Sequence, residues 1–448
     1  MPQSRPPPPP PPLRLPRLDP DRQTWMRAPE TLAVLRALSG NASDRGAADG
    51  ALARFVGGCV RDALAGRMGA GADIDIDIAT PLLPEEVTRR LEAAGLRAVP
   101  TGIAHGTVTA VVNRRPFEIT TLRRDVETDG RRAVVAFTTD WTEDAARRDF
   151  TFNALFAEPD GTLHDPFGGI ADLKAGRVRF VGEADLRIRE DVLRILRFCR
   201  FHARFGAGAP SGPDFEACVA RRDLLPQLSA ERVRRELSRL LACDRPVPTL
   251  EAMIARGLLA HWLPEAREVA ALQAATARAD AAGRRDWLRR LAVLAPVETR
   301  AAAHAQAERL RLSNAEAERL ADFAEPSVPF HPDLPVAARR EALYRIGRDR
   351  AWDLAILGAA RAEGTGADPT PWQALMAEAE AWRPRDLPIS GADALAAGLP
   401  PGPAVGRCLR AVETWWIARD FAPDRAACLD RLAAEAARLS ADNGADAG

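Results

Sequence analysis

Residues 55–80 read FVGGCVRDALAGRMGAGADIDIDIAT and determine how the first half of the chain is organised. A short apolar run ends at Val56, Gly57 and Gly58 form a turn without Cβ atoms, and VRDALAGR predicts a helix. A strand, a glycine turn and a helix N-terminus in this order present backbone N–H groups where the helix dipole is positive. The pattern therefore suits the phosphates of a nucleotide.

The second part of this stretch, DIDIDIAT at 73–80, alternates charged and apolar residues and predicts a β-strand. A period of two puts Asp73, Asp75 and Asp77 on one face and the isoleucines on the other. Aspartates along one face repel each other unless a cation lies among them, and such carboxylates suit Mg²⁺ shared with substrate phosphates. A plain glycine turn followed by a solvated acidic strand is the alternative, and the close succession of the two features disfavours it.

GGCVRD followed by DIDIAT resembles the catalytic core of bacterial class II tRNA nucleotidyltransferases. These are the CCA-adding enzymes and their poly(A) polymerase relatives in the DNA polymerase beta superfamily. The resemblance implies that Asp75 and Asp77 are catalytic metal ligands and that Gly58 and Arg61 contact the nucleotide. Specific motifs carry it over about residues 50–245, and a looser likeness extends over 385–435.

Two further strands are expected at 106–113 and 116–123, on either side of a short basic turn. In the second strand Glu118 faces away from Phe117 and Ile119, which makes it a candidate third carboxylate near the metals. The alternative is a surface glutamate. The segment TGIAHGTVT at 101–109, which contains His105, resembles the CCA-adding type, and the arginine-rich strand of bacterial poly(A) polymerases is not found there. His105 itself is assigned no chemistry.

The string EDAARRDFTFNAL at 143–155 combines buried phenylalanines with charged residues, which are expected in the N-terminal part of a helix. Arg148 fits a clamp on the triphosphate, and Asp149 fits an acceptor for a ribose hydroxyl. A surface cluster of ion pairs is the alternative. The string matches RRDFTxNAL of the family, which favours the nucleotide site.

The stretch REDVLRILRFCRFHARF at 189–205 predicts an amphipathic helix. Its polar stripe has one member at every third residue: Asp191, Arg194, Arg197 and Arg200. Arginines on one stripe repel each other by ~0.2–0.5 kcal/mol per exposed pair unless an anion lies among them. The family has an EDxxR helix here, so these four residues are predicted to bind the nucleotide, with Asp191 and Arg194 reading its base.

The helical period of 3.6 continues from Arg187 to the end of the chain. We therefore expect an α/β head of the polymerase-beta-like nucleotidyltransferase type, followed by an all-α part. The predicted divisions are a disordered Pro-rich tail at 1–22, the nucleotidyltransferase head at 23–180, a helical neck for base recognition at 181–245, a helical body at 246–325, and a helical tail for tRNA binding at 326–448. DPFGG at 165–169 is expected to act as a hinge.

Composition limits the class of protein further. The formal net charge is zero, so a nucleic-acid partner must be recognised by local patches of arginine. The six cysteines form no CxxC pair, which predicts reduced core thiols and excludes a zinc site or a disulfide framework. No run approaches 18 apolar residues and no signal-peptide core is present. We expect a soluble, cytoplasmic protein without a membrane partner.

These features predict a Mg²⁺-dependent enzyme that adds CMP, CMP and AMP from CTP and ATP to the 3′ end of tRNA and releases pyrophosphate. A poly(A) polymerase of the same fold is the nearest alternative. A CC-adding enzyme is disfavoured because the polar segment 121–137, similar to the family's flexible loop or else a surface hairpin, has full length. An RNA-binding protein with an inactive site is disfavoured by the intact pair Asp75 and Asp77.

Overall fold

The computed structural model describes residues 16–39, 52–67, 74–102, 106–129, 132–267 and 269–445. The chain divides into two compact units, Met1–His261 and Trp262–Gly448. Asp73, His105 and most of the Pro-rich tail lie outside the described residues. Within the described ranges no helix is both long and apolar enough to span a membrane. All six cysteines are buried and none forms a disulfide bond, as the sequence predicts.

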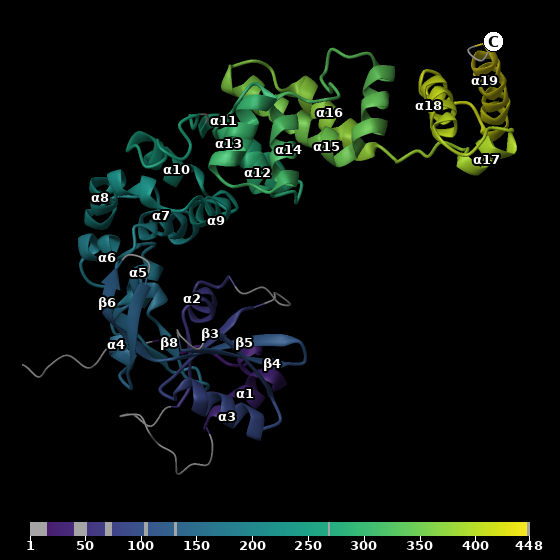
Figure 1. The fold of residues 1–448 in the computed structure, drawn as a ribbon. Coiled ribbons are helices and arrows are strands. Elements are labelled where there is room, and N and C mark those ends of the chain that lie inside the picture. Colours follow the sequence, from purple (N-terminus) through teal and green to yellow (C-terminus); the bar gives the residue numbers. More distant parts are fainter. Residues whose placement is uncertain are drawn as a thin grey trace, which may run out of the picture. The chain divides into compact units, whose positions relative to one another are not determined.

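The first unit is built on a seven-stranded sheet with the order β3-β4-β5-β2-β1-β8-β9 and a separate two-stranded ribbon, β6-β7 (Figure 1). The sheet is mixed because β2 and β5 run parallel while the other neighbours are antiparallel. The ribbon shows that the segment 121–137 contains a hairpin. The strands are β1 (Arg54–Val56), β2 (Ile76–Thr80), β3 (Arg97–Gly102), β4 (Thr107–Val112), β5 (Arg115–Thr121), β6 (Arg123–Asp129), β7 (Arg132–Phe137), β8 (Phe156–Ala157) and β9 (Leu163–His164).

The pleat of the central strand β2 and its neighbour β5 separates apolar from acidic side chains. Phe117 and Ile119 of β5 are buried, while Glu118 between them is exposed, as the alternation predicts. Asp77 lies opposite Glu118 in the parallel register. Since β2 begins at Ile76, Asp75 lies just before the strand rather than within it. The centre of the sheet thus presents carboxylates on one face only.

Helices surround the sheet, and after the last strand, β9, the regular elements of the described residues are all helices. The helix α3 begins with a proline and two glutamates and stops before Gly95, whose φ of 73° suits glycine. Pro84, Val87 and Leu91 are its buried residues. The helices of the first unit are η1 (Thr24–Met26), α1 (Pro29–Ser39), α2 (Gly58–Leu64), α3 (Pro84–Ala93), α4 (Trp141–Ala146), η3 (Thr151–Asn153), α5 (Gly169–Lys174), α6 (Ala184–Glu190), α7 (Leu193–Phe205), α8 (Pro213–Ala220), η4 (Arg222–Gln227), α9 (Ala230–Leu241) and α10 (Val247–Ala255).

The stretch 189–205 is not one helix, so the expectation of a single continuous stripe from Asp191 to Arg200 is wrong. The helix α6 ends at Glu190, and α7 begins at Leu193. Asp191 between them is extended, with φ −150°, and its Oδ1 accepts the N–H of Leu193 at 3.1 Å. A carboxylate that accepts a free backbone N–H at a helix start stabilises that start. Asp191 therefore binds the first N–H of α7 from the position before its N-cap, Val192, and the regular stripe starts only at Arg194.

The basic pair in RRDFTFN also lies elsewhere than expected. The helix α4 ends at Ala146 with Arg147 as its C-cap, so Arg148 and Asp149 follow a helix rather than begin one. The short helix η3 comes next and carries Asn153. Asp140, whose side chain accepts the N–H groups of Thr142 and Glu143, is what starts α4. The charged residues thus occupy the turn between α4 and η3.

A cluster of aromatic rings joins this turn to α7. The ring of Phe150 lies 4.9 Å from Phe180, 6.2 Å from Phe198 and 5.3 Å from Phe201 between centroids. Phe152 lies 5.5 Å from Phe201. Aromatic pairs at these separations stabilise by ~0.5–1.5 kcal/mol each beyond the apolar area that they bury. The cluster therefore fixes α7 against the loop that carries Arg148 and Asp149.

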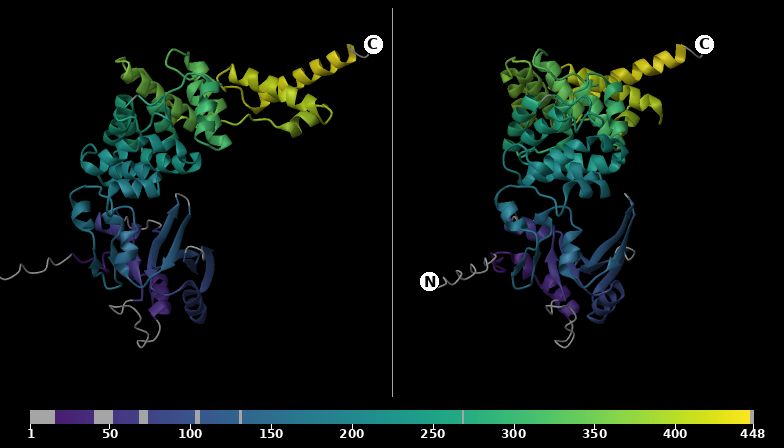
Figure 2. Two further views of the ribbon diagram at one scale, coloured as in Figure 1. Left: turned by 60° about the vertical axis from the view of Figure 1, so that its left-hand side comes forward. Right: turned by 90° about the vertical axis from the view of Figure 1, so that its left-hand side faces the viewer.

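The second unit is entirely helical within its described residues, and the strands lie only in the purple and blue part of the ribbon (Figure 2). Its helices are α11 (Val269–Ala281), α12 (Trp287–Leu294), α13 (Arg300–Arg309), α14 (Asn314–Ala324), α15 (Val336–Gly364), α16 (Thr370–Ala381), α17 (Gly391–Ala396), α18 (Pro403–Ile417) and α19 (Arg425–Ala445). The helix α15 is interrupted at Gly347, where φ is 74°.

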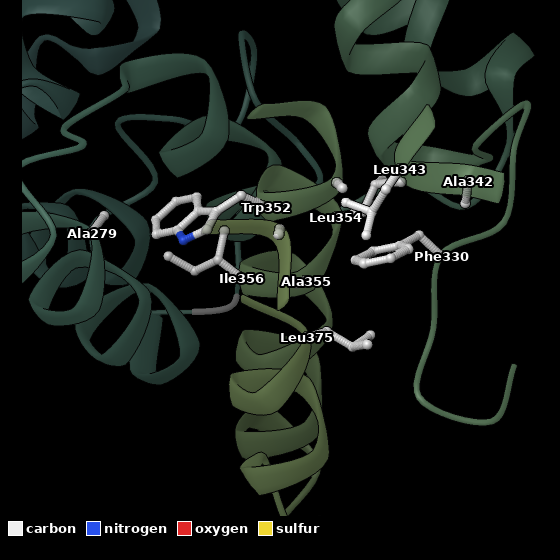
Figure 3. Packing of buried hydrophobic residues seen from close by; sticks show 11 residues of the cluster. Ala279, Phe330, Ala342, Leu343, Trp352, Leu354, Ala355, Ile356 and Leu375 are labelled. Carbon is white, nitrogen blue, oxygen red and sulfur yellow. The ribbon is translucent and has the colours of Figure 1, made fainter. Parts of the chain in front are cut away.

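Two hydrophobic clusters lie around α15 and α18 in this unit. In the first, Trp352 and Ile356 of α15 pack with Ala279 of α11 and with Leu375 of α16 (Figure 3). The second gathers α17, α18 and α19 around Trp416. Trp416 is buried, and the partly buried Trp415 packs against the same cluster.

The DPFGG segment connects the sheet to the helical region through α5. Asp165 accepts the N–H groups of Gly169 and Ile170 at 2.7 and 2.9 Å, which caps α5. A Cβ atom on Gly169 would overlap the carbonyl oxygen of Thr151 in η3. The absence of a side chain at this position thus lets α5 touch η3 and sets the place of Asn153.

We predict that Gly169→Ala destabilises the first unit by about 1–3 kcal/mol, because the added methyl group must push α5 away from η3. Chemical or thermal unfolding followed by circular dichroism measures the loss. Ala171→Ser adds one heavy atom to the exposed face of the same helix and serves as the matched control, with an expected change within ~0.5 kcal/mol. Equal stability of the two variants would contradict the close contact.

Candidate active site

A pocket of about 420 Å³ opens between the glycine turn, the α4–η3 loop and the start of α7, entirely within the first unit. Six arginines and three aspartates line it, so its lining carries an excess of positive charge. Eight residues predicted from the sequence meet here. The complete lining is Gly57, Gly58, Arg61, Asp77, Arg147, Arg148, Asp149, Asn153, Asp191, Leu193, Arg194, Arg197, Phe201 and Arg232.

The backbone of the glycine turn lies close to one basic and one acidic side chain. Gly57 has φ 69° and ψ −121° and precedes α2. A Cβ atom here would lie 3.5 Å from Nη1 of Arg148 and 3.9 Å from Oδ2 of Asp77. Any larger residue would fill the space between these two side chains and would be strained at this φ. The turn therefore keeps room for a ligand between a guanidinium and a carboxylate.

Asp77 is in an electrostatically unfavourable position. Burial is the main cause that raises its pKa to about 6, and the carboxylates of Glu118 and Asp75 raise it further. Arg148 and Arg61 act in the opposite direction and do not balance them. A cation beside Asp77 would reverse this shift, because an opposite charge within a few ångströms favours the ionised form.

The carboxylates fit a magnesium ion that a substrate shares. Within the described ranges no group of three or more His, Cys, Asp or Glu side chains is gathered so as to enclose a metal by itself. Mg²⁺ is generally held by one or two protein carboxylates, with waters and substrate phosphates as its other ligands. Asp77, with Asp75 just before the strand and Glu118 beside it, offers such an incomplete oxygen set next to a basic pocket.

Arg148 is held in place by a buried acid. Asp144 is almost fully buried and accepts Nη2 of Arg148 at 2.9 Å and Nε of Arg147 at 2.8 Å. Burial raises the pKa of Asp144, but the two guanidiniums outweigh it and hold the pKa below its ordinary value. Arg187 of α6 donates to the carbonyl oxygens of Arg147 and Arg148, which ties the loop to the helical region.

Asp149 lies at the centre of a hydrogen-bonded chain that links three elements. Its Oδ2 accepts Nε of Arg197 at 2.7 Å, and its Oδ1 accepts Nδ2 of Asn153 at 2.8 Å and the N–H of Phe150. Asn153 in turn accepts Nη1 of Arg61 through its Oδ1 at 2.6 Å. Burial raises the pKa of Asp149, but Arg197 and these donors together hold it below its ordinary value.

Asp191 and Arg194 both line the pocket, yet each has its own partner. Arg232 of α9 donates to both carboxylate oxygens of Asp191, at 3.0 and 2.8 Å. Arg194 donates to Glu190 at 2.5 Å and to the carbonyl oxygen of Arg187 at 2.7 Å. The two side chains are therefore oriented by α6 and α9, and each retains further hydrogen-bonding capacity.

Arg200, also predicted to bind the nucleotide, is not among the lining residues. It is buried, and its Nε donates to Glu236 of α9 at 2.5 Å. Sequence reasoning missed four polar or aromatic members of the pocket: Arg147, Asn153, Phe201 and Arg232. Asn153 is the asparagine of the RRDFTxNAL string, so this motif could have identified it. The only available signal for Arg232 was its place on the charged helix ERVRREL.

Residues 53–179 match the model of the poly A polymerase head domain, and 215–269 match the model described as the probable RNA and SrmB-binding site of polymerase A. With the mixed sheet and the basic pocket, this match defines the class: a nucleotidyltransferase head followed by helices. More specifically, the chain belongs to the CCA-adding enzyme family, because a Geobacillus stearothermophilus CCA-adding enzyme is 33% identical over 86% of this chain and 91% of its own.

Two further comparisons agree. The mitochondrial CCA tRNA nucleotidyltransferase 1 of Danio rerio is 46% identical over 46% of this chain, and the match spans 47% of that protein. The chain thus aligns with about half the length of this vertebrate relative. The crystal structure of a Bacillus stearothermophilus CCA-adding enzyme in complex with CTP has a TM-score of 0.67 at 29% identity, and the match covers 92% of this chain and 98% of that one.

The raised pKa of Asp77 yields a prediction about stability. A folded-state pKa of about 6 against an ordinary value of 3.8 means that the contribution of Asp77 is most favourable below pH 4 and is lost as the pH rises through 6. Without divalent cations, Asp77→Asn should therefore be more stable than the wild type at pH 7 by about 1–3 kcal/mol, and no more stable at pH 4.

Thermal melts of both proteins across this pH range, in the presence of a chelator, measure the difference. Millimolar Mg²⁺ at pH 7 should raise the melting temperature of the wild type and leave Asp77→Asn unchanged, because the variant lacks the charge that binds the ion. A gain in stability that is the same at pH 4 and pH 7 would show that the carboxylate is not destabilised by its surroundings.

Proposed function

We propose that the protein is a CCA tRNA nucleotidyltransferase, which adds CMP, CMP and AMP from CTP and ATP to the 3′ end of tRNA and releases pyrophosphate. The observation that carries the proposal is the single pocket in which Asp77, beside Glu118, faces a set of arginines next to a glycine turn. Membership of the CCA-adding enzyme family supports it. We also propose tRNA as the partner and the cytoplasm as the site of action, in keeping with six cysteines that form no disulfide bond.

The carboxylates would hold Mg²⁺ and the arginines would hold the triphosphate. Asp75 and Asp77 are the proposed ligands, with Glu118 as a third carboxylate beside them; the ion would lower the pKa of the attacking 3′-hydroxyl and neutralise the leaving phosphates. Gly58, Arg61 and Arg148 bind and orient the triphosphate. A guanidinium offers a planar set of donors that matches phosphate oxygens and keeps its charge at every physiological pH.

Asp149 and Arg197 are the proposed contacts to the sugar side of the nucleotide. A carboxylate can accept a ribose hydroxyl, which distinguishes ribonucleotides from deoxyribonucleotides. Both oxygens of Asp149 already accept protein donors, so the hydroxyl would use a remaining lone pair of a rigid acceptor. Arg200 contributes from behind this contact through Glu236, because Glu236 also lies 3.8 Å from Arg197.

Asp191 and Arg194 are the proposed base readers. Cytosine and adenine both present an amino donor beside a ring-nitrogen acceptor, and a carboxylate only accepts while a guanidinium only donates. Uracil and guanine present the two groups reversed and would leave buried polar groups unpaired, at ~1–3 kcal/mol for each. A small movement of α7 relative to the sheet would let one pair serve both bases.

The decisive test is product sequencing on a tRNA that lacks its CCA end. We expect two cytidines with CTP alone, no addition with ATP alone, and CCA when both are supplied. A long adenosine tract from ATP would identify a poly(A) polymerase, and a product that stops after CC would identify a CC-adding enzyme.

Asp75→Ala and Asp77→Ala provide the control for this assay. Each should abolish addition, because a ligand of the proposed metal is removed, while circular dichroism should show an intact fold. If the wild-type protein adds no nucleotide in the presence of Mg²⁺, the result would favour an RNA-binding protein with an inactive site. Substantial activity of either variant would rule out the assignment of the metal ligands.

Base selection gives a separate prediction. Asp191→Ala or Arg194→Ala should lower kcat/KM for CTP and ATP by about ten- to a hundredfold and raise the relative use of UTP and GTP, with Mg²⁺ dependence retained. The matched controls are Asp185→Ala and Arg189→Ala, an ion pair on α6 outside the pocket. Unchanged nucleotide preference in the Asp191 and Arg194 variants would show that this pair does not read the base.

A further inference from the structure

Three arginine side chains converge on one aromatic ring in the wall of the pocket. The guanidinium carbons of Arg61, Arg197 and Arg200 lie 5.0, 5.4 and 4.0 Å from the centroid of Phe201. Arg61 comes from α2, and the other two come from the same helix as the ring. Phe201 is 3% exposed and lines the pocket, so its contacts with the arginines are largely shielded from water.

The ring itself has little freedom to move. Its centroid lies 5.3 Å from Phe150 and 5.5 Å from Phe152, both nearly perpendicular to it, and 6.2 Å from Phe205. Because buried aromatic rings in such clusters are closely packed, the face of Phe201 is a fixed surface. A guanidinium placed on a fixed surface loses less conformational freedom when it later binds a ligand.

Guanidiniums that crowd one place repel each other, and the ring reduces this cost. An aromatic face attracts a cation by ~0.5–1 kcal/mol at exposed sites and by about 2 kcal/mol when the pair is desolvated. Of the acids and amides around the ring, Asn153 and Asp62 contact Arg61, Asp149 contacts Arg197, and Glu236 contacts Arg200 and, at 3.8 Å, Arg197. Phe201 is the element that the three arginines share.

We propose that Phe201 is a positioning residue of the nucleotide site. Its ring holds the guanidiniums of Arg61 and Arg197 toward the pocket before the triphosphate arrives, and it keeps Arg200 on its other contact, Glu236, away from the ligand. The proposal rests on the proposed function in that it takes a triphosphate as the ligand. It accounts for two observations at once: why Arg200 lies outside the pocket, and why an apolar side chain stands in a wall of charges.

A role in core packing alone is the competing explanation, and α7 offers a matched control for it. Phe198 lies on the same helix, is 1% exposed and packs with Phe150, Phe180 and Phe215 in the same cluster. Within the described residues no guanidinium lies over its ring, and it does not line the pocket. Loss of either ring opens a similar defect in the core, but only Phe201 faces arginines.

The experiment compares Phe201→Met, Phe201→Tyr and Phe198→Met. Methionine fills most of the volume of phenylalanine without an aromatic face, and tyrosine retains the face. The readouts are the Kd for inorganic tripolyphosphate by calorimetry, KM for CTP against kcat at saturating tRNA, and the melting temperature. We expect Phe201→Met to weaken tripolyphosphate binding and raise KM for CTP by about three- to tenfold, with a smaller change in kcat.

Phe201→Tyr should restore most of the affinity, and Phe198→Met should lower the melting temperature with affinity unchanged. The proposal is overturned if Phe198→Met weakens binding as much as Phe201→Met, if Phe201→Met binds like the wild type, or if the wild type does not bind tripolyphosphate. A wild type that binds tripolyphosphate in this pattern but adds no nucleotide to tRNA would refute the proposed function and leave the inference intact.

Discussion

The ion pair between Asp149 and Arg197 is the interaction on which the rest of the site depends. Asp149 lies in the loop that follows α4, in the part of the chain that holds the sheet. Arg197 lies on the helix α7 of the helical region, so the ion pair joins the two parts. Asn153 extends the connection to Arg61 on α2. A largely buried pair of this kind is costly to break, because the partner that remains is an uncompensated charge with little water around it. The glycine turn, the loop after α4 and the helix α7 therefore keep their positions together.

The balance of charge in the pocket follows a consistent plan. Arg148, Arg194 and Arg197 each have a carboxylate partner on the protein, which places their guanidiniums without neutralising the whole pocket. Asp77, by contrast, is repelled by neighbouring groups of its own charge, the carboxylates of Glu118 and Asp75. An anionic ligand accompanied by a cation satisfies both groups, whereas either one alone satisfies only half of the site.

The alternation of β5 and β2 was predictable because side chains of a strand alternate strictly, so Phe117, Ile119 and the isoleucines had to face the core. The break at Asp191 was not, since a charged stripe at helical spacing looks the same whether or not the helix is interrupted within it. The position of Arg148 after α4 was missed for a related reason. Acidic and basic residues are common at both ends of a helix, and only the capping by Asp140 fixes which end is which.

Local periodicity, turn chemistry and short motifs were enough to predict the mixed α/β head, the helical remainder and the identity of most pocket residues. Tertiary contacts decide which charged side chains pair with other protein groups and which face the pocket. Arg200 and Arg197 are equivalent in the sequence pattern, yet one faces Glu236 and the other the pocket. That difference depends on contacts with Glu236 of α9 and with Asp149, and a linear sequence does not state which distant side chains will meet.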